Sequence, residues 1–192
     1  MNSEEFYDTL YETPIICTIK SSKDLETALR DESPIIFILF GDILTISNIV
    51  GKATKAGKVV FVHIDLIDGL SSQSVAVDYL ARHTGLTGII STKGSIIKQA
   101  KAAGLLTIHR CFILDSLALE GVKKQLLFEY ADAIEVLPGV MPKIIKSLVH
   151  LSKKPVIASG LVMDKEDVIA SLKAGAVAVS SSKPSIWRHN FE

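Results

Sequence analysis

Residues 155–183, with the sequence PVIASGLVMDKEDVIASLKAGAVAVSSSK, indicate the fold most clearly. Its two apolar, β-branched runs, Pro155–Ala158 and Ala176–Ser180, have the length and the flanking small residues of buried strands. Between them, Asp164 is placed to cap a helix over Lys165–Lys173, which ends just before a glycine. Short apolar strands joined by a helix are typical of a parallel sheet that helices cover on both faces.

The same unit recurs along the whole chain. Six further apolar runs precede it: Ile15–Ile19, Ile35–Leu39, Val59–Ile64, Gly88–Ser91, Leu106–Phe112 and Ala133–Leu137. Helical patterns separate the runs, among them Ser22–Arg30, Ser71–Arg82 and Pro142–His150, and the pattern over Gly94–Ala103 is the weakest. Eight alternating units predict a compact α/β fold, a (β/α)8 barrel.

The length of the chain bears on this prediction. Its 192 residues are fewer than the roughly 250 that are usual for the fold, so we expect some helices to be short or missing. No Gly-x-Gly-x-x-Gly follows the first strand, which disfavours an open doubly wound sheet. Nothing resembles a linker or a second domain, so we expect a single domain over residues 1–192.

Charge and composition exclude several classes of protein. The 21 basic residues balance the 21 acidic ones, so no global positive charge indicates nucleic-acid binding. No apolar run is long enough to span a membrane and the N-terminus is acidic, so we expect a cytoplasmic protein without membrane attachment. Cys17 and Cys111 lie in apolar runs with no partner at metal-ligand spacing, so we expect buried, reduced thiols.

The residues that follow the strands should lie together, because the functional face of such a barrel is built from the strand C-termini. The seventh and eighth strands end in small residues, which let backbone N–H groups approach an anion closely. Pro184 can begin a short helix just beyond, whose N-terminus adds a positive dipole end. The pattern predicts a phosphate site formed by Ser159, Gly160, Leu161, Ser180, Ser181 and Ser182. The alternative is that these small residues only permit tight turns.

Charged residues at other strand ends are candidates for binding the rest of a ligand: Asp65, Lys93, Arg110 and Glu135. A carboxylate inside a barrel strand must be paired, hydrogen-bonded or exposed at the mouth. Strand parity can point Glu135 into the barrel, where a ligand hydroxyl or Arg110 would satisfy it. An internal ion pair that only stabilises the barrel is the alternative for Glu135, and solvation at the strand ends is the alternative for Lys93 and Arg110.

A metal site is the less favoured interpretation of a third group. His63 and Asp65 share a strand parity, and Asp68 follows in the next loop. A hydrogen-bonded histidine–aspartate pair is a more common outcome than a metal site, so we expect no metal. No motif pairs a nucleophile with a base, so we also expect no catalytic residues.

Six segments, in order and across nearly the whole chain, carry a resemblance to a known family: His63–Leu70, Gly88–Lys93, Arg110–Ser116, Asp132–Lys143, Pro155–Val162 and Ala174–Ser182. They resemble the glycerol-uptake operon antiterminator regulatory proteins, in which a small barrel responds to glycerol 3-phosphate. The resemblance implies an antiterminator without cofactor or catalysis, which binds an mRNA leader when glycerol 3-phosphate is bound. Whether the protein forms a homo-oligomer is left open by the sequence. Ser159, His109 and Ser181 stand where the family usually has Gly, Gln and Thr.

The residues and the resemblance agree on a small phosphorylated polyol, because backbone amides suit a phosphate and carboxylates suit hydroxyls. They agree less readily on RNA, since the chain has no basic run and no aromatic stacking motif. Local lysine patches could supply that surface, and mixed solvated helix faces are the alternative: Lys52, Lys55, Lys58, Lys98, Lys101, Lys123, Lys124, Lys143, Lys146, Lys153 and Lys154. The alternative function is a barrel lyase, isomerase or transferase acting on a phosphorylated polyol, because one fold supports many chemistries.

Overall fold

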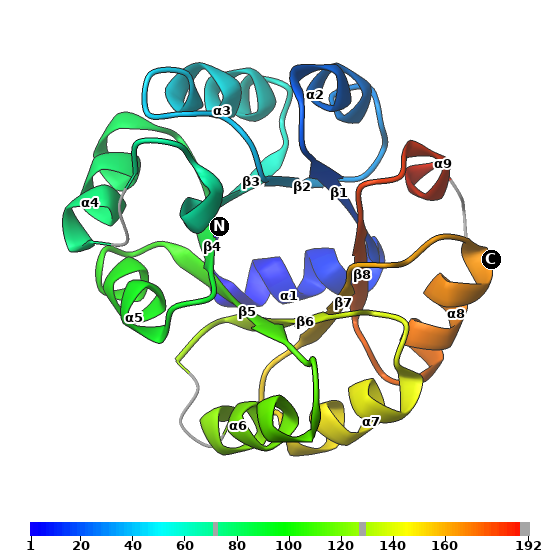
Figure 1. Cartoon of the computed structure of the whole chain (residues 1–192). Helices are drawn as coiled ribbons and strands as arrows, with labels where there is room; N and C mark the ends of the chain where they lie inside the picture. The colour runs from blue at the N-terminus through cyan, green and yellow to red at the C-terminus, as the bar shows by residue number, and fades with distance from the viewer. Residues whose placement is uncertain (71–72, 127–129, 189–192) are drawn as a thin grey trace.

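Eight parallel strands close into a barrel, in their order along the chain, in this computed structural model of the protein (Figure 1). The strands are β1 (Ile15–Ile19), β2 (Ile35–Ile38), β3 (Val59–His63), β4 (Gly88–Ser91), β5 (Leu106–Phe112), β6 (Ala133–Leu137), β7 (Val156–Ser159) and β8 (Ala178–Ser181). Pairing of β1 with β8 leaves no sheet edge. The structure describes residues 1–70, 73–126 and 130–188. The predicted (β/α)8 barrel is confirmed.

A helix follows every strand and covers the outside of the barrel (Figure 1). These helices are α2 (Ser22–Ala28), α3 (Ile46–Lys55), α4 (Ser74–His83), α5 (Gly94–Ala102), α6 (Ser116–Leu126), α7 (Pro142–Leu151), α8 (Lys165–Lys173) and α9 (Pro184–Trp187). The chain is small because α2 has seven residues and α9 four, so short helices were expected correctly. No helix is missing between the described strands, and the weakly patterned segment forms α5. The first residues of the predicted helix Ser71–Arg82 lie outside the described residues.

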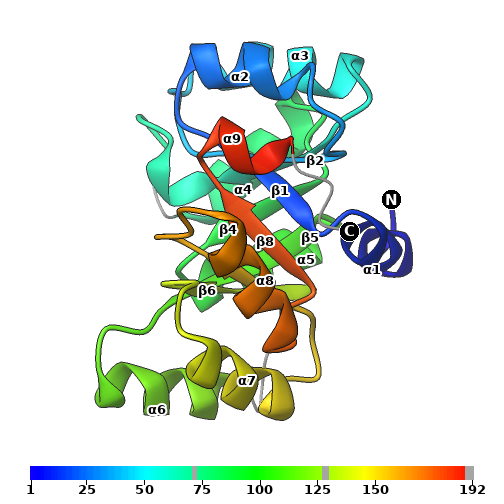
Figure 2. The same ribbon diagram turned by 90° about the vertical axis from the view of Figure 1, so that its right-hand side faces the viewer.

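A further helix, α1 (Ser3–Glu12), precedes the barrel and closes its N-terminal end (Figure 2). Asn2 caps it in a capping box with Glu5, which explains why this acidic segment is helical. Phe6 and Leu10 are fully buried in the cluster that fills the barrel interior, and the Phe6 ring lies 5.0 Å from that of Phe61. The helix therefore completes the core, although the pattern of eight units does not predict it.

The barrel interior changes from apolar to polar along its axis. In a barrel of tilted strands, inward-facing residues from alternate strands share a layer. The strand register gives three successive layers toward the strand C-termini: Ile16, Phe61, Ile108 and Ile157; then Phe37, Ile90, Glu135 and Ser180; then Thr18, His63, Arg110 and Ser159. The third layer is wholly polar. It forms the floor of the barrel mouth.

Both cysteines lie in strands and are buried as free thiols, as expected. Burial, and next the carboxylate of Asp31, raise the pKa of the Cys17 thiol. Among the helices in the described part of the chain, none is long and apolar enough to cross a bilayer.

Candidate functional site

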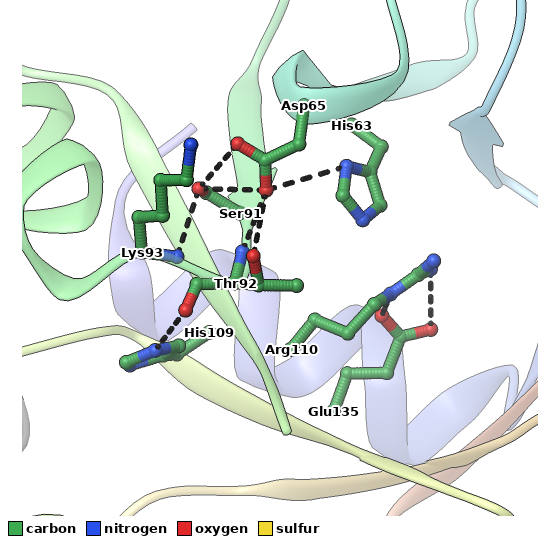
Figure 3. A network of polar contacts seen from close by, with 8 residues as sticks. All are labelled: His63, Asp65, Ser91, Thr92, Lys93, His109, Arg110 and Glu135. Atoms are coloured by element: carbon green, nitrogen blue, oxygen red, sulfur yellow. Dashed lines mark hydrogen bonds and ion pairs between the residues drawn. The ribbon is translucent and has the colours of Figure 1, made fainter. Parts of the chain in front are cut away.

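An ion pair occupies the centre of the mouth. Arg110 on β5 and Glu135 on β6 are partners in register, and both side chains point into the barrel (Figure 3). The Arg110 Nε donates to Glu135 Oε2 at 2.6 Å, and its Nη2 donates to Oε1 at 3.1 Å. Glu135 is fully buried and Arg110 is 6% exposed, so the two-pronged geometry is needed to offset desolvation of both charges. Glu135 thus faces inward, which is one of the orientations that strand parity allowed, and it has the internal partner that was the alternative to a ligand.

Two serines extend this pair across the barrel. The Ser180 Oγ donates to Glu135 Oε1 at 2.9 Å and lies 2.7 Å from the Ser159 Oγ. Side chains from β5, β6, β7 and β8 therefore form one hydrogen-bonded chain. Ser181 differs from them, because its Oγ accepts from the Lys183 N–H at 3.2 Å in the turn after β8. The roles of these serines toward a phosphate stay predictions.

The loops after β7 and β8 carry unused backbone donors. Gly160 and Leu161 are consecutive left-handed residues, with φ of 75° and 59°. A left-handed leucine is uncommon, and such conformations are concentrated at binding sites. Within the described part of the chain, the N–H groups of Gly160, Leu161 and Ser182 have no acceptor. Free N–H groups at this end of a barrel are suited to binding a phosphate.

The carboxylate of Asp65 is held by the opposite side of the mouth. Asp65 lies in η1, the 3-10 turn Ile64–Leu66 after β3. Its Oδ2 accepts from the Thr92 N–H at 2.8 Å, the Thr92 Oγ1 at 3.1 Å and the Ser91 Oγ at 3.0 Å (Figure 3). The shared parity expected for His63 and Asp65 is wrong, because the strand ends at His63 and the turn redirects Asp65 toward β4.

The loops after β4 and β8 repeat one sequence and one conformation. Residues 91–96 read STKGSI and residues 181–186 read SSKPSI. In both loops the first serine accepts from the lysine N–H, at 3.1 and 3.2 Å, and the lysine precedes a helix with ψ of 114°. The Thr92 N–H in the first loop binds a carboxylate, whereas its equivalent in the second loop, the Ser182 N–H, is one of the unused donors. The two loops therefore differ in that the donor of the first is occupied by Asp65 and the donor of the second is not.

Thr18 is a functional candidate that the sequence analysis did not identify. His63 is a second candidate, which the sequence analysis considered only for a metal site or a hydrogen bond with Asp65. The side-chain atoms His63 Nδ1 and Thr18 Oγ1 are buried without a hydrogen-bond partner. The His63 Nδ1 lies 3.8 Å from Asp65 Oδ2, which is too far for a hydrogen bond. Burial, and next the charge of Arg110, lower the pKa of His63 to about 4, although Asp65 and Glu135 oppose the shift. The ring is therefore neutral at pH 7. Alternation from Ile16 to Thr18 along β1 is the signal that could have identified Thr18.

The remaining candidates lie at the edge of this site. Lys93 is exposed at the N-terminus of α5, next to the loop that holds Asp65. Asp68 lies beyond η1 and pairs by a backbone bridge with Asp42. Among the residues that the structure describes, no three His, Cys, Asp or Glu side chains gather in a group that could hold a metal.

Comparison with known proteins identifies relatives over most of the chain. The model of a family described as "Glycerol-3-phosphate responsive antiterminator" matches residues 15–187. The uncharacterized protein YgcP of Escherichia coli (strain K12) is 42% identical over 178 residues, which are 93% of each chain.

Solved structures agree. A glycerol uptake operon antiterminator regulatory protein from Listeria monocytogenes is 33% identical, with a TM-score of 0.87 over 90% of this chain and 94% of that one. A glycerol uptake operon antiterminator-related protein from Thermotoga maritima is 30% identical, with a TM-score of 0.81 over 91% and 98%. A deoxyribose phosphate aldolase from Aeropyrum pernix, at 17% identity and a TM-score of 0.69 over 97% of each chain, shares the fold alone.

Proposed function

The chain belongs to the family of glycerol-3-phosphate responsive antiterminators, and we propose that it binds glycerol 3-phosphate at the barrel mouth. In that state it binds the mRNA leader of glycerol-utilisation genes in the cytoplasm. Glycerol 3-phosphate acts as an effector, and the protein needs neither a cofactor nor a catalytic residue. A homo-oligomer is compatible with this activity.

The repeated loop is the observation that carries the proposal. The backbone N–H of Thr92 and the neighbouring hydroxyls hold the Asp65 carboxylate after β4. The loop after β8 presents the same backbone with a free Ser182 N–H, and the Gly160 and Leu161 N–H groups are free in the adjacent loop. A phosphate from a ligand suits these free N–H donors, in the same way as the Asp65 carboxylate suits the donors of the loop after β4.

A basic surface on α6 and α7 supports the RNA-binding part of the proposal. No acidic residue occurs between Glu135 and Asp164, a segment that includes α7 and four lysines. The two helices lie next to each other (Figure 1), and the lining of a groove of about 670 Å³ beside them includes Lys143, Lys146 and His150. Lys123 also lines it, with its Nζ 2.8 Å from Glu120 Oε1. Lysines along a groove bind a phosphate backbone by releasing its counterions. The segment between Glu135 and Asp164 of this neutral chain is therefore basic.

A barrel enzyme is the function against which the proposal is tested. The charged groups that face the barrel centre, Arg110 and Glu135, neutralise one another, and His63 is neutral. This arrangement favours ligand binding over acid–base chemistry, because neither charge is poised to take or give a proton.

The test is a thermal unfolding series with glycerol 3-phosphate, glycerol and inorganic phosphate, followed by gel shifts with a leader hairpin. We expect glycerol 3-phosphate to stabilise the protein most, by about 2.7 kcal/mol at a hundredfold excess over Kd, and to strengthen RNA binding. Absence of any stabilisation would refute the proposal that glycerol 3-phosphate is the ligand. Absence of a gel shift would refute the proposal that the protein binds the leader RNA. Conversion of glycerol 3-phosphate into a product after long incubation would favour the enzyme.

A further inference from the structure

Two buried polar atoms at the mouth have no partner in the protein. Thr18 is 5% exposed and His63 is 3% exposed, and their atoms Thr18 Oγ1 and His63 Nδ1 are the ones found unsatisfied among the described residues. Leaving a buried polar atom unpaired costs free energy, so such atoms are rare and call for an explanation. A ligand that pairs with them provides one.

The fold places these two atoms in one layer with a polar chain on the other side. Thr18, His63, Arg110 and Ser159 form the polar layer at the floor of the mouth. Arg110 and Ser159 are already engaged, through Glu135 and Ser180. The buried polar atoms of this layer that have no partner at all therefore lie on β1 and β3, apart from the backbone donors of the loops after β7 and β8.

The charges around Thr18 and His63 disfavour an anionic group here, in addition to the phosphate at the loops after β7 and β8. His63 is neutral because burial and Arg110 lower its pKa. The charge of Arg110 is neutralised by Glu135, and the Asp65 carboxylate lies 3.8 Å from the His63 ring nitrogen. A neutral group that both donates and accepts fits here, and an alcohol hydroxyl is such a group.

We propose that Thr18 and His63 form a hydroxyl-binding subsite, which recognises the glycerol end of the effector while the loops after β7 and β8 hold its phosphate. This inference rests on the proposed function and deepens it by naming the groups that select the ligand. A phosphate ester without hydroxyls leaves both atoms unpaired, so the subsite discriminates against it. Inward-facing hydrogen-bonding groups, and not charges, then determine specificity.

The test compares glycerol 3-phosphate with propyl phosphate, which has the same phosphate and carbon chain but no hydroxyl. Calorimetric titrations use the wild type, Thr18→Val, which removes the hydroxyl at nearly constant volume, and Thr18→Ser, which retains it. We expect the wild type to prefer glycerol 3-phosphate by at least about fivefold, Thr18→Val to lose most of that preference, and Thr18→Ser to keep it. Propyl phosphate should bind all three proteins equally.

A parallel set of variants addresses His63 and the fold. His63→Leu should lose the preference as Thr18→Val does, whereas Ile16→Val, at the inward position below Thr18, should keep it. Thermal unfolding of each variant reports whether it is folded. A wild-type preference that survives in a folded Thr18→Val, or equal wild-type affinity for the two esters, would overturn the subsite and leave the phosphate site standing. Failure of the wild type to bind either ester would instead refute the proposed function, and the subsite with it.

Discussion

At the scale of single residues, the mouth contains a histidine that the fold keeps uncharged. His63 is buried beside Arg110, and these two effects outweigh the attraction of Asp65 and Glu135 for a proton. A neutral imidazole retains one donor and one acceptor, which a protonated ring does not. The residue is thus suited to bind a neutral group at physiological pH, and it makes the folded state sensitive to acid.

We predict that His63 contributes to acid destabilisation. Its pKa is about 4 in the folded protein and about 6.5 in an unfolded chain, so the unfolded state binds more protons between these values. The free energy of unfolding should therefore fall as pH is lowered from about 6.5 to about 4, by roughly 3 kcal/mol from this residue. Urea unfolding of the wild type and His63→Gln at pH 7 and 4.5 measures it. Carboxylates titrate in both proteins, so an equal loss of stability in the two would contradict the prediction.

At the scale of the elements, the loop after β7 combines a strained backbone with free donors. Gly160 has a φ of +75°, and a Cβ there would meet the Leu137 Cδ2 at 3.1 Å. Gly57, after α3, has a similar φ of +78°, but a Cβ there would meet no atom within 4 Å. The two glycines therefore allow the conformational strain to be separated from the geometry of the mouth.

We predict that Gly160→Val abolishes binding of glycerol 3-phosphate, because it displaces the Gly160 and Leu161 N–H groups. Gly57→Val should lose similar stability from the left-handed conformation, roughly 1–2 kcal/mol, and bind the ligand normally. Calorimetric titration and thermal unfolding of both variants test this. Wild-type affinity in a folded Gly160→Val would show that the loop does not bind the phosphate.

At the scale of the whole molecule, ligand and RNA must be coupled through the protein. A bound dianion by itself disfavours a polyanionic partner, so activation requires two arrangements of the molecule that differ in affinity for RNA. Such coupling is typically about 1–3 kcal/mol, or roughly 5- to 150-fold in affinity. Segment 182–187, which contains the end of the loop after β8 and the helix α9, is the part of the mouth that we expect the ligand to order.

We predict that the α6–α7 groove binds the RNA backbone. The double variant Lys143→Gln/Lys146→Gln should weaken binding of a leader hairpin and reduce the slope of log K against log salt by about two, because each lysine that neutralises a phosphate contributes about one. The matched control is Lys52→Gln/Lys55→Gln on α3, where Lys52 is 3.6 Å from Glu26. Gel shifts over a salt series measure both. Equal weakening in the two double variants, or impaired binding of glycerol 3-phosphate, would contradict this location.

The strands and most of the helices could be predicted from the sequence alone. The eight predicted runs match the observed strands within two residues at each end. Strands buried on both faces need continuous apolar runs, and such runs are visible locally. The cap at Asp164 and the short helix after Pro184 are equally local, and both are observed.

Which polar groups meet depends on the tertiary structure. Alternation along one strand says which residues face inward, but strand tilt and barrel closure determine the layer that joins Thr18 to His63. The turn η1 moved Asp65 out of the parity expected for it, and the register of β5 against β6 gave Glu135 its partner Arg110. The helix α1 closes the barrel by packing Phe6 against Phe61 of β3. Each of these depends on contacts between residues distant in sequence, which no local pattern encodes.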